Sequence, residues 1–225
     1  MKIALITPIY NEEESLPLFL TTLKKQIINN KHHSYSIVAI NDGSNDSTAQ
    51  ILKEYQQQMG DFYILNLEKN LGQQAAIHKG LEYVQRLNYD AVIIIDADMQ
   101  DPIDCIPKMI KLWEAGYRIV LTTYQNNPET SYLRRLLRRI YYFGLKIFTP
   151  ILQNSTDFML LDIKVLNEIM QTNNYPVLLR HEVHRFESLH ILKIERNQRI
   201  FGRSKYTYLK MIKFGLLSIR RFLNL

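Results

Sequence analysis

Short apolar runs alternate with longer amphipathic segments through the first 124 residues, and this alternation constrains the fold more than any other feature. Apolar runs of this kind are typical of buried strands, whereas apolar residues recurring every three or four positions are typical of helices. Strands are expected at Ile3–Thr7, Tyr35–Ile40, Phe62–Leu67, Ala91–Ile95 and Arg118–Thr123. Helices are expected between them, at Glu13–Ile28, Ser47–Gln58, Gln73–Leu87 and Pro107–Ala115. Repeated strand–helix units predict an α/β fold, a mostly parallel sheet flanked by helices on both faces.

The acidic string after the fourth expected strand is the most informative motif for function. Val92–Ile95 reads as a buried strand, and Asp96, Asp98 and Asp101 follow it. Because side chains alternate along a strand, Asp96 and Asp98 are expected to point the same way, with Cα atoms about 6.5–7 Å apart. Two such carboxylates repel each other unless a cation lies between them, and hard oxygen ligands favour Mg²⁺ or Mn²⁺. The alternative is an ordinary polar loop that leads into the next helix.

Polar clusters also follow the first two expected strands. TPIYNEE places Pro8, Tyr10 and Glu12 at one strand end, and INDGSNDST places Asp42 at the other. The carboxyl ends of parallel strands meet at one edge of a sheet, where ligands bind. Tyr10 is expected to pack on a base, Glu12 to bond a base or ribose, and Asp42 to face the rim and accept hydrogen bonds from a base. The alternatives are a helix-start role for Glu12 and a turn role for Asp42.

Two further segments carry local signals. Gly43 permits a tight turn after the second strand, and Asp46 or Ser47 is expected to cap the next helix. The string NLGQQAAIHKGL, residues 70–81, combines a glycine turn with small residues at a helix start, which allow close packing on a sheet or close approach of a ligand. Its His78 is interpreted as structural and kept out of the site.

Composition and charge narrow the class of protein. The 225 residues are 46% hydrophobic, which suits one globular domain. The single cysteine, Cys105, excludes an internal disulfide framework and fits a reducing compartment. We expect no signal peptide, and no apolar stretch reaches the roughly 20 residues that span a bilayer. Residues 1–112 carry a net charge of −4 and residues 113–225 one of +10, so the second half is expected to meet an anionic partner.

The second half contains two expected amphipathic helices. Each has an apolar stripe beside Lys and Arg, and they cover Leu133–Phe148 and Tyr206–Leu225. Such a helix can lie in a membrane interface, or it can pack on a protein core. Both remain open for the first helix, whereas the charge pattern favours the membrane for the second.

Taken together, these strings resemble family 2 glycosyltransferases of the GT-A fold, and most of all the polyprenyl-phosphate branch that includes dolichyl-phosphate mannose synthases. PIYNEE, NDGSNDST, NLGQQAAIHKGL and DADMQDP occur in the order of that family. IFGRSKY, with Arg196 and Arg199 before its glycine, resembles the R-x-x-R-x-x-G-x-SKY element of the branch. The resemblance covers essentially the whole chain. It implies a GT-A catalytic domain over 1–205, made of a nucleotide-sugar half (1–124) and an acceptor half (125–205), followed by an interfacial helix over 206–225.

The resemblance also implies roles for individual residues. Asp96 and Asp98 match the metal motif, with Gln100 assisting, and Asp96 also lies on the donor side. Pro8, Tyr10, Glu12 and Asp42 match positions that hold the nucleoside. Arg199, Ser204 and Lys205 match a segment that closes on the phosphates of donor and acceptor. Asp157, in TDFMLLD, matches an Asp near the reacting centre, so Asp157 and Asp98 are the catalytic candidates.

Some positions depart from the family pattern. Asn41 stands where a first Asp is usual in D-D-G-S, and Thr156 and Met159 replace the Gly and Arg of G-D-F-R. An Arg that is common after the fifth strand is missing from LTTYQNN. These departures affect the expected acceptor contacts more than the donor site.

The leading hypothesis is a metal-dependent, inverting glycosyltransferase that moves a sugar from a UDP- or GDP-sugar to polyprenyl phosphate. It is expected to be cytoplasmic and peripheral on the inner face of the cell membrane. The enzymatic alternative is transfer to a glycan or a lipid-linked saccharide. A nucleotide- or nucleic-acid-binding module is a third hypothesis, but nucleic acid is not an expected partner, because the aromatics Tyr141, Tyr142 and Phe143 occur at helical spacing. A homo-oligomer or a partner supplying a membrane anchor remains open.

Overall fold

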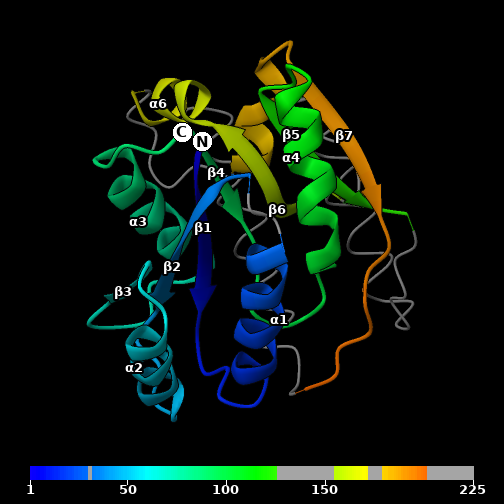
Figure 1. Cartoon of the computed structure of the whole chain (residues 1–225). Helices are drawn as coiled ribbons and strands as arrows, with labels where there is room; N and C mark the ends of the chain where they lie inside the picture. Colours follow the sequence, from blue (N-terminus) through cyan, green and yellow to red (C-terminus); the bar gives the residue numbers. More distant parts are fainter. Residues whose placement is uncertain (30–31, 126–154, 172–178, 202–225) are drawn as a thin grey trace, which may run out of the picture.

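A computed structural model describes residues 1–29, 32–125, 155–171 and 179–201, which form a seven-stranded sheet with helices on both faces (Figure 1). The strands are β1 (Lys2–Ile9), β2 (Ser34–Asn41), β3 (Phe62–Asn66), β4 (Ala91–Ile94), β5 (Ile119–Tyr124), β6 (Ser155–Asp162) and β7 (Leu189–Ile194). The helices are α1 (Leu16–Asn29), α2 (Thr48–Gln58), α3 (Gln73–Gln85), α4 (Ile106–Glu114), α6 (Ile163–Gln171) and α7 (Leu179–Glu182). Two 3₁₀ turns, η1 (Ile103–Cys105) and η2 (Val183–Arg185), precede α4 and follow α7.

The strand order is β3-β2-β1-β4-β6-β5-β7, and the sheet is mostly parallel, as expected. β1 pairs in parallel with β2 and β4, and β5 pairs in parallel with β7. β6 runs antiparallel to both of its neighbours, β4 and β5. The carboxyl ends of β1, β2 and β4 therefore lie at one edge of the sheet, and β6 begins at that same edge.

Two apolar layers hold the helices to the sheet. On one face, buried side chains of the sheet pack against α1, α2 and α4. On the other face, they pack against α3, α6 and α7. Alternate residues of a strand supply the two layers, so Ile3 and Leu5 face one layer while Ala4 and Ile6 face the other. The predicted α/β architecture with helices on both faces is confirmed.

Helix α3 lies especially close to the sheet because of one glycine. A Cβ added at Gly80 would come within 2.8 Å of Ile6 Cγ2 and 2.8 Å of Ile40 Cδ1. A larger residue would push the helix away from β1 and β2. The close contact matters for function because α3 begins, at Gln73, on the edge where β1, β2 and β4 end.

Several expectations about individual elements were wrong. The strands β6 and β7 and the helix α6 were not expected at all. The first helix begins at Leu16 rather than near Glu13. The Glu13 carboxylate instead accepts the Ser47 N–H at 2.9 Å and so joins the loop after β1 to the loop after β2. Before α2, Ser47 makes no side-chain cap, whereas the Asp46 carboxylate accepts the Thr48 N–H at 3.0 Å.

Other expectations lie outside the described residues. These are the helices at 133–148 and 206–225, the domain boundary at residue 205, and the residues Ser204 and Lys205. In the part of the chain that the structure describes, no helix has both the length and the apolar character needed to cross a membrane.

Candidate active site

The loops after β1 and β2 are joined by hydrogen bonds at the carboxyl edge of the sheet. The backbone N–H of Asn11 donates to Ser44 Oγ at 3.0 Å, and the N–H of Asn45 donates to Asn11 Oδ1 at 2.8 Å. The N–H of Glu12 donates to Thr48 Oγ1 at 3.0 Å. Asn11 adopts a left-handed φ of 50°, which Asn tolerates better than most residues. Two of the three predicted polar clusters therefore form one rigid rim.

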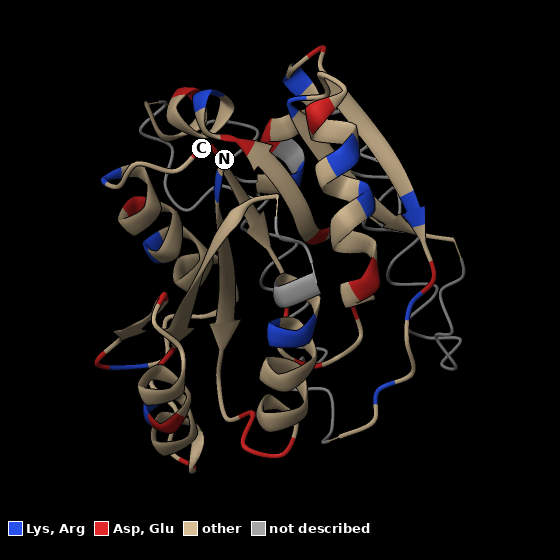
Figure 2. Cartoon of the chain, viewed as in Figure 1, with Lys and Arg blue, Asp and Glu red and all other residues tan. Residues whose placement is uncertain are grey.

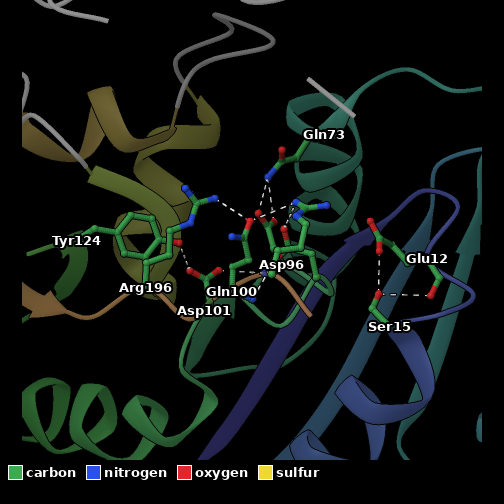
Figure 3. A network of polar contacts seen from close by, with 10 residues as sticks. Glu12, Ser15, Gln73, Asp96, Gln100, Asp101, Tyr124 and Arg196 are labelled. Carbon is green, nitrogen blue, oxygen red and sulfur yellow. Dashed lines mark hydrogen bonds and ion pairs between the residues drawn. The ribbon is translucent and has the colours of Figure 1, made fainter. Parts of the chain in front are cut away.

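The predicted nucleoside contacts of the first loop lie on this rim. Pro8 is the seventh residue of β1 and pairs with Ile40, and Tyr10 follows directly after the strand. Glu12 stands apart from the other acids in Figure 3, where its carboxylate faces Ser15. Ser15 donates its hydroxyl to Glu12 Oε2 at 2.7 Å, so Glu12 takes part in the entry to α1. This contact agrees with the helix-start alternative for Glu12.

Asp42 was expected to face the open rim, but it does not. Its side chain is buried, and its two oxygens accept the backbone N–H groups of Leu71 at 2.7 Å and Gly72 at 2.9 Å. Burial raises the pKa of Asp42, and the two backbone hydrogen bonds oppose this rise. These contacts agree with the turn role weighed for this residue, and the turn that it stabilises is the one before α3.

Asp96 is the centre of an acidic group. Gln73 Nε2 donates to both oxygens of Asp96, at 2.9 and 3.0 Å (Figure 3). Burial raises the pKa of Asp96 well above its usual range, and the carboxylates of Asp101, Asp98 and Asp157 raise it further. Carboxylates that repel in this way hold a proton more readily than usual, and a bound cation would relieve the repulsion between them.

The strand geometry expected for Asp96 and Asp98 is wrong. β4 ends at Ile94, and the chain turns at Asp98, followed by Met99 with a left-handed φ of 62°. The turn is closed by the Gln100 N–H, which donates to Asp98 Oδ1 at 3.1 Å. Local hydrogen bonds of this kind compete with strand continuation at Asp residues.

Asp101 supports the turn through hydrogen bonds with two neighbouring groups. Its Oδ2 accepts the Asp96 N–H at 3.4 Å, and its Oδ1 accepts the Tyr124 hydroxyl at 2.7 Å. Burial raises the pKa of Asp101 to about 7, and the hydrogen bond from Tyr124 opposes this rise. The same burial, together with Asp101, raises the pKa of Tyr124, which therefore stays a hydrogen-bond donor.

Two arginines from the connector after β7 lie over the acidic turn. Arg199 Nη2 contacts Asp98 Oδ2 at 2.5 Å and Gln100 Oε1 at 3.2 Å. Arg196 Nη2 donates to Gln100 Oε1 at 2.8 Å, and its guanidinium lies 5.0 Å from the ring centroid of Tyr124. Figure 2 shows basic positions in blue along the chain that follows β7. The structure thus brings Arg199 to the predicted metal motif.

Asp157 joins the same site from β6. The last β4–β6 pairs are Ile93 with Leu160 and Ile94 with Met159, so continuing this register by two residues places Asp96 opposite Asp157. Gln74 Nε2 donates to Asp157 Oδ2 at 2.7 Å. The other oxygen, Oδ1, is buried and has no hydrogen-bond partner among the described residues.

The donor set fits a hard divalent cation. Among the described residues, no three His, Cys, Asp or Glu side chains gather into a ready-made metal cage. Mg²⁺ and related ions are commonly held by one or two carboxylates together with substrate phosphates. The neighbouring carboxylates of Asp96 and Asp98 meet the protein's share of that requirement.

The sequence prediction missed the residues that hold these acids. Gln73, Gln74 and Tyr124 were given no site role, and Arg196 was matched to a motif without one. Only their positions in the fold could have indicated a site role. Tyr124 ends a strand, and the two glutamines begin a helix at the same edge of the sheet. None of them has the charge pattern that singled out Asp96.

A family model and several known proteins match this chain in sequence. The family model for glycosyl transferase family 2 matches residues 4–172. A bactoprenol glucosyl transferase of Shigella phage SfX is 32% identical over 225 residues, which cover 99% of this chain and 72% of the relative. An undecaprenyl-phosphate 4-deoxy-4-formamido-L-arabinose transferase of Serratia proteamaculans is 32% identical and covers 94% of this chain, which spans 64% of that relative.

Solved structures share the fold. S. aureus TarS 1-349 in complex with UDP-GlcNAc has a TM-score of 0.62 at 15% identity, covering 99% of this chain and 66% of that chain. Glucosyl-3-phosphoglycerate synthase from Mycobacterium tuberculosis, with Mn²⁺, UDP-glucose and phosphoglyceric acid, has a TM-score of 0.59 at 14% identity, covering 100% of this chain and 80% of that chain. At these identities the likeness shows the fold alone, which is the GT-A fold expected from the sequence. With the family match over three quarters of its length, the chain belongs to glycosyl transferase family 2.

Proposed function

We propose that this glycosyltransferase moves a sugar from a UDP- or GDP-sugar to polyprenyl phosphate, with Mg²⁺ or Mn²⁺ as cofactor. The observation that carries the proposal is the contact between the acidic turn and the basic connector, made by Asp98 and Arg199. A nucleoside diphosphate bridged to a divalent cation needs both carboxylates and guanidinium groups at one place. The acids serve the cation and the arginines serve the phosphates.

The donor lies, in this proposal, across the carboxyl edge of the sheet. Pro8 and Tyr10 on the rim contact the nucleoside, and the hydrogen bonds between the first two loops keep that rim rigid. Glu12 and Asp42 support the rim through their own hydrogen bonds. Asp96 and Asp98 hold the cation with Gln100 beside them, and Arg199 contacts the diphosphate.

Transfer is a single displacement at the anomeric carbon. An oxygen of the acceptor phosphate forms the new bond to this carbon, while the bond to the donor diphosphate breaks and its electron pair leaves with the nucleoside diphosphate. Asp96 and Asp98 would hold a divalent cation that neutralises the charge building up on this leaving group. Arg199 stabilises the same charge through its guanidinium. Attack from the opposite side inverts the configuration of the carbon.

Asp157 lies on the acceptor side of the acidic group. An acceptor phosphate is already an anion, so it needs no strong base to become a nucleophile. Asp157 instead positions the sugar or the acceptor, using the oxygen that has no partner among the described residues. The predicted contacts of Ser204 and Lys205 with phosphate, and the lipid-facing role of the helix at 206–225, complete the acceptor side in this proposal.

The relatives support the choice of acceptor. One is named a bactoprenol glucosyl transferase and another an undecaprenyl-phosphate sugar transferase, and both align with nearly all of this chain. A polyprenyl phosphate resides in a membrane, so we place the enzyme peripherally at the cytoplasmic face, where nucleotide sugars are available.

The test is a screen of nucleotide sugars with undecaprenyl phosphate and Mn²⁺ or Mg²⁺, reading lipid-linked sugar by thin-layer chromatography and mass spectrometry. The proposal expects lipid-linked product from one donor or a few donors. Product that forms only on soluble glycans would contradict it.

The second candidate is transfer to a hydroxyl of a glycan or a lipid-linked saccharide. It is favoured by the buried, unpartnered Oδ1 of Asp157, because a carboxylate oxygen of that kind could accept the proton of an acceptor hydroxyl. The same screen separates the two candidates when saccharide acceptors are added. Asp157→Asn would then reduce transfer to hydroxyl acceptors far more than transfer to phosphate acceptors.

A further inference from the structure

The two acids on either side of the proposed reaction centre come from different strands. Asp96 follows β4 and Asp157 belongs to the neighbouring strand β6, and the two carboxylates lie close enough for Asp157 to raise the pKa of Asp96. Two carboxylates this close repel each other. A third element is therefore needed to hold each carboxylate at a defined position.

Helix α3 supplies that element through its first two residues. Gln73 donates to both oxygens of Asp96 at 2.9 and 3.0 Å, and Gln74 donates to Oδ2 of Asp157 at 2.7 Å. Successive residues on a helix point about 100° apart, so neighbouring side chains reach two different acids. Figure 3 shows Gln73 reaching from the helix toward Asp96.

The chemistry of an amide suits this task. An amide N–H fixes a carboxylate without neutralising it, so the negative charge stays available to a cation or a substrate. A Lys or Arg at either position would bring a positive charge that competes with the metal. The glutamines therefore orient the acids and leave their charge free.

The start of α3 is itself fixed to the sheet edge. The buried Asp42 accepts the N–H groups of Leu71 and Gly72, and Gly72 adopts a left-handed φ of 92°. Gly80 lets the helix lie against Ile6 and Ile40. A continuous set of contacts thus runs from β2 through the turn to the two glutamines.

We infer that Gln73 and Gln74 are positioning residues: the amide of Gln73 orients the metal-side carboxylate of Asp96, and the amide of Gln74 orients the acceptor-side carboxylate of Asp157. The inference rests on the proposed function for the roles of the two acids. It goes beyond that function because it states that the start of α3 positions both the metal-side and the acceptor-side carboxylate. Gln74 occupies one oxygen of Asp157 and leaves the buried Oδ1 for the substrate.

The first experiment measures Mn²⁺ binding by electron paramagnetic resonance, with UDP or GDP present and no acceptor. Gln73→Met is expected to weaken Mn²⁺ binding by about tenfold, in line with the usual effect of removing a partner of a metal ligand. Gln74→Met is expected to leave it unchanged, as is the control Gln85→Met, an exposed residue at the other end of α3. Equal binding by both glutamine variants would overturn the assignment of Gln73.

The second experiment is a double-mutant cycle between Gln74 and Asp157. Gln74→Met is expected to lower kcat by about 10- to 100-fold with donor KM within about twofold, since it acts on orientation rather than donor binding. In an Asp157→Asn background it should cause no further loss, because the group that it orients is already altered. Fully additive losses, or a change in KM alone, would overturn the assignment of Gln74.

Failure of this inference and failure of the proposed function give different results in these experiments. Circular dichroism spectra and melting temperatures that match those of Gln85→Met establish that each variant is folded. Gln74→Leu serves as a second variant if Gln74→Met does not fold. If no sugar reaches polyprenyl phosphate, the acceptor assignment fails. The difference in Mn²⁺ binding still supports Gln73 in that case, and the cycle is measured on the acceptor that the enzyme does use.

Discussion

Arg199 and Asp98 form an ion pair across the acidic turn, with Nη2 and Oδ2 2.5 Å apart. They are separated by 101 positions in the sequence, and the contact closes the connector after β7 onto the loop after β4. The same carboxylate is a proposed metal ligand. If Asp98 binds a divalent cation as proposed, Arg199 competes with that cation for the carboxylate in the nucleotide-free protein, and a bound diphosphate would offer Arg199 an alternative partner.

This relationship leads to a prediction for Arg199→Ala. Mn²⁺ should bind more tightly to the nucleotide-free variant, because Asp98 loses a competing cation, and isothermal titration calorimetry measures this. Donor KM should rise by about tenfold or more, because hydrogen bonds to charged groups contribute about 1.5–3 kcal/mol. Arg185→Ala, which removes an exposed arginine paired with Glu182, is the matched control. Unchanged Mn²⁺ affinity together with unchanged KM would contradict the competition.

The metal role of the acidic turn is tested by removing each carboxylate. Asp96→Asn and Asp98→Asn should each lower kcat/KM by about 100-fold or more, since a metal contributes several kcal/mol to stabilising the leaving group. Chelation by EDTA should abolish wild-type activity, and added Mn²⁺ or Mg²⁺ should restore it. Asp104→Asn, at an exposed acid shortly after the turn, should retain full activity. Activity that survives both EDTA and the two substitutions would rule out a metal-dependent reaction.

Gly43 is required by both its backbone conformation and its surroundings. Its φ is +66°, and an added Cβ would lie 2.6 Å from the Lys69 carbonyl carbon and 2.7 Å from the Asn70 nitrogen. Gly43→Ala should therefore lower the free energy of unfolding by about 1–3 kcal/mol, the usual cost of such backbone strain. Gly60→Ala has open space around its Cβ and is the control. Urea unfolding followed by circular dichroism measures both, and equal stability of the two variants would disprove the steric argument.

The first half of the fold was predictable because its signals are local. β1, β2 and β4 each contain a run of apolar residues, and each is followed by a polar cluster that marks the strand end. β6 escaped prediction because its apolar residues follow the polar start of TDFMLLD and its partners are distant in the sequence. β7 lies at the edge of the sheet, where alternating exposure weakens the apolar pattern.

The site was predictable as far as charge and motif order reach. Asp96, Asp98 and Asp157 come together as the resemblance implied, and Arg199 joins them. The contacts that orient the acids were not predictable, since Gln74 and Asp157 are 83 positions apart and an amide has no pattern of its own. The burial of Asp42 was not predictable either, because the motif alone does not reveal that backbone N–H groups bind both of its oxygens.

Asp42 offers a test between a structural and a nucleoside-binding role. Asp42→Ala removes the acceptor of two backbone N–H groups in a buried position, which should lower the free energy of unfolding by about 1–3 kcal/mol. The substitution should also weaken Mn²⁺ binding in the presence of UDP or GDP, because the start of α3 carries Gln73 to Asp96.

Asp61→Ala, at an exposed acid before β3, is the matched control and should change neither quantity. Thermal unfolding and the Mn²⁺ titration are measured on the same preparations. An Asp42→Ala variant of unchanged stability but with a raised donor KM would instead assign the residue to the nucleoside. A variant that loses stability and Mn²⁺ affinity together places Asp42 at the base of the contacts that hold the two glutamines.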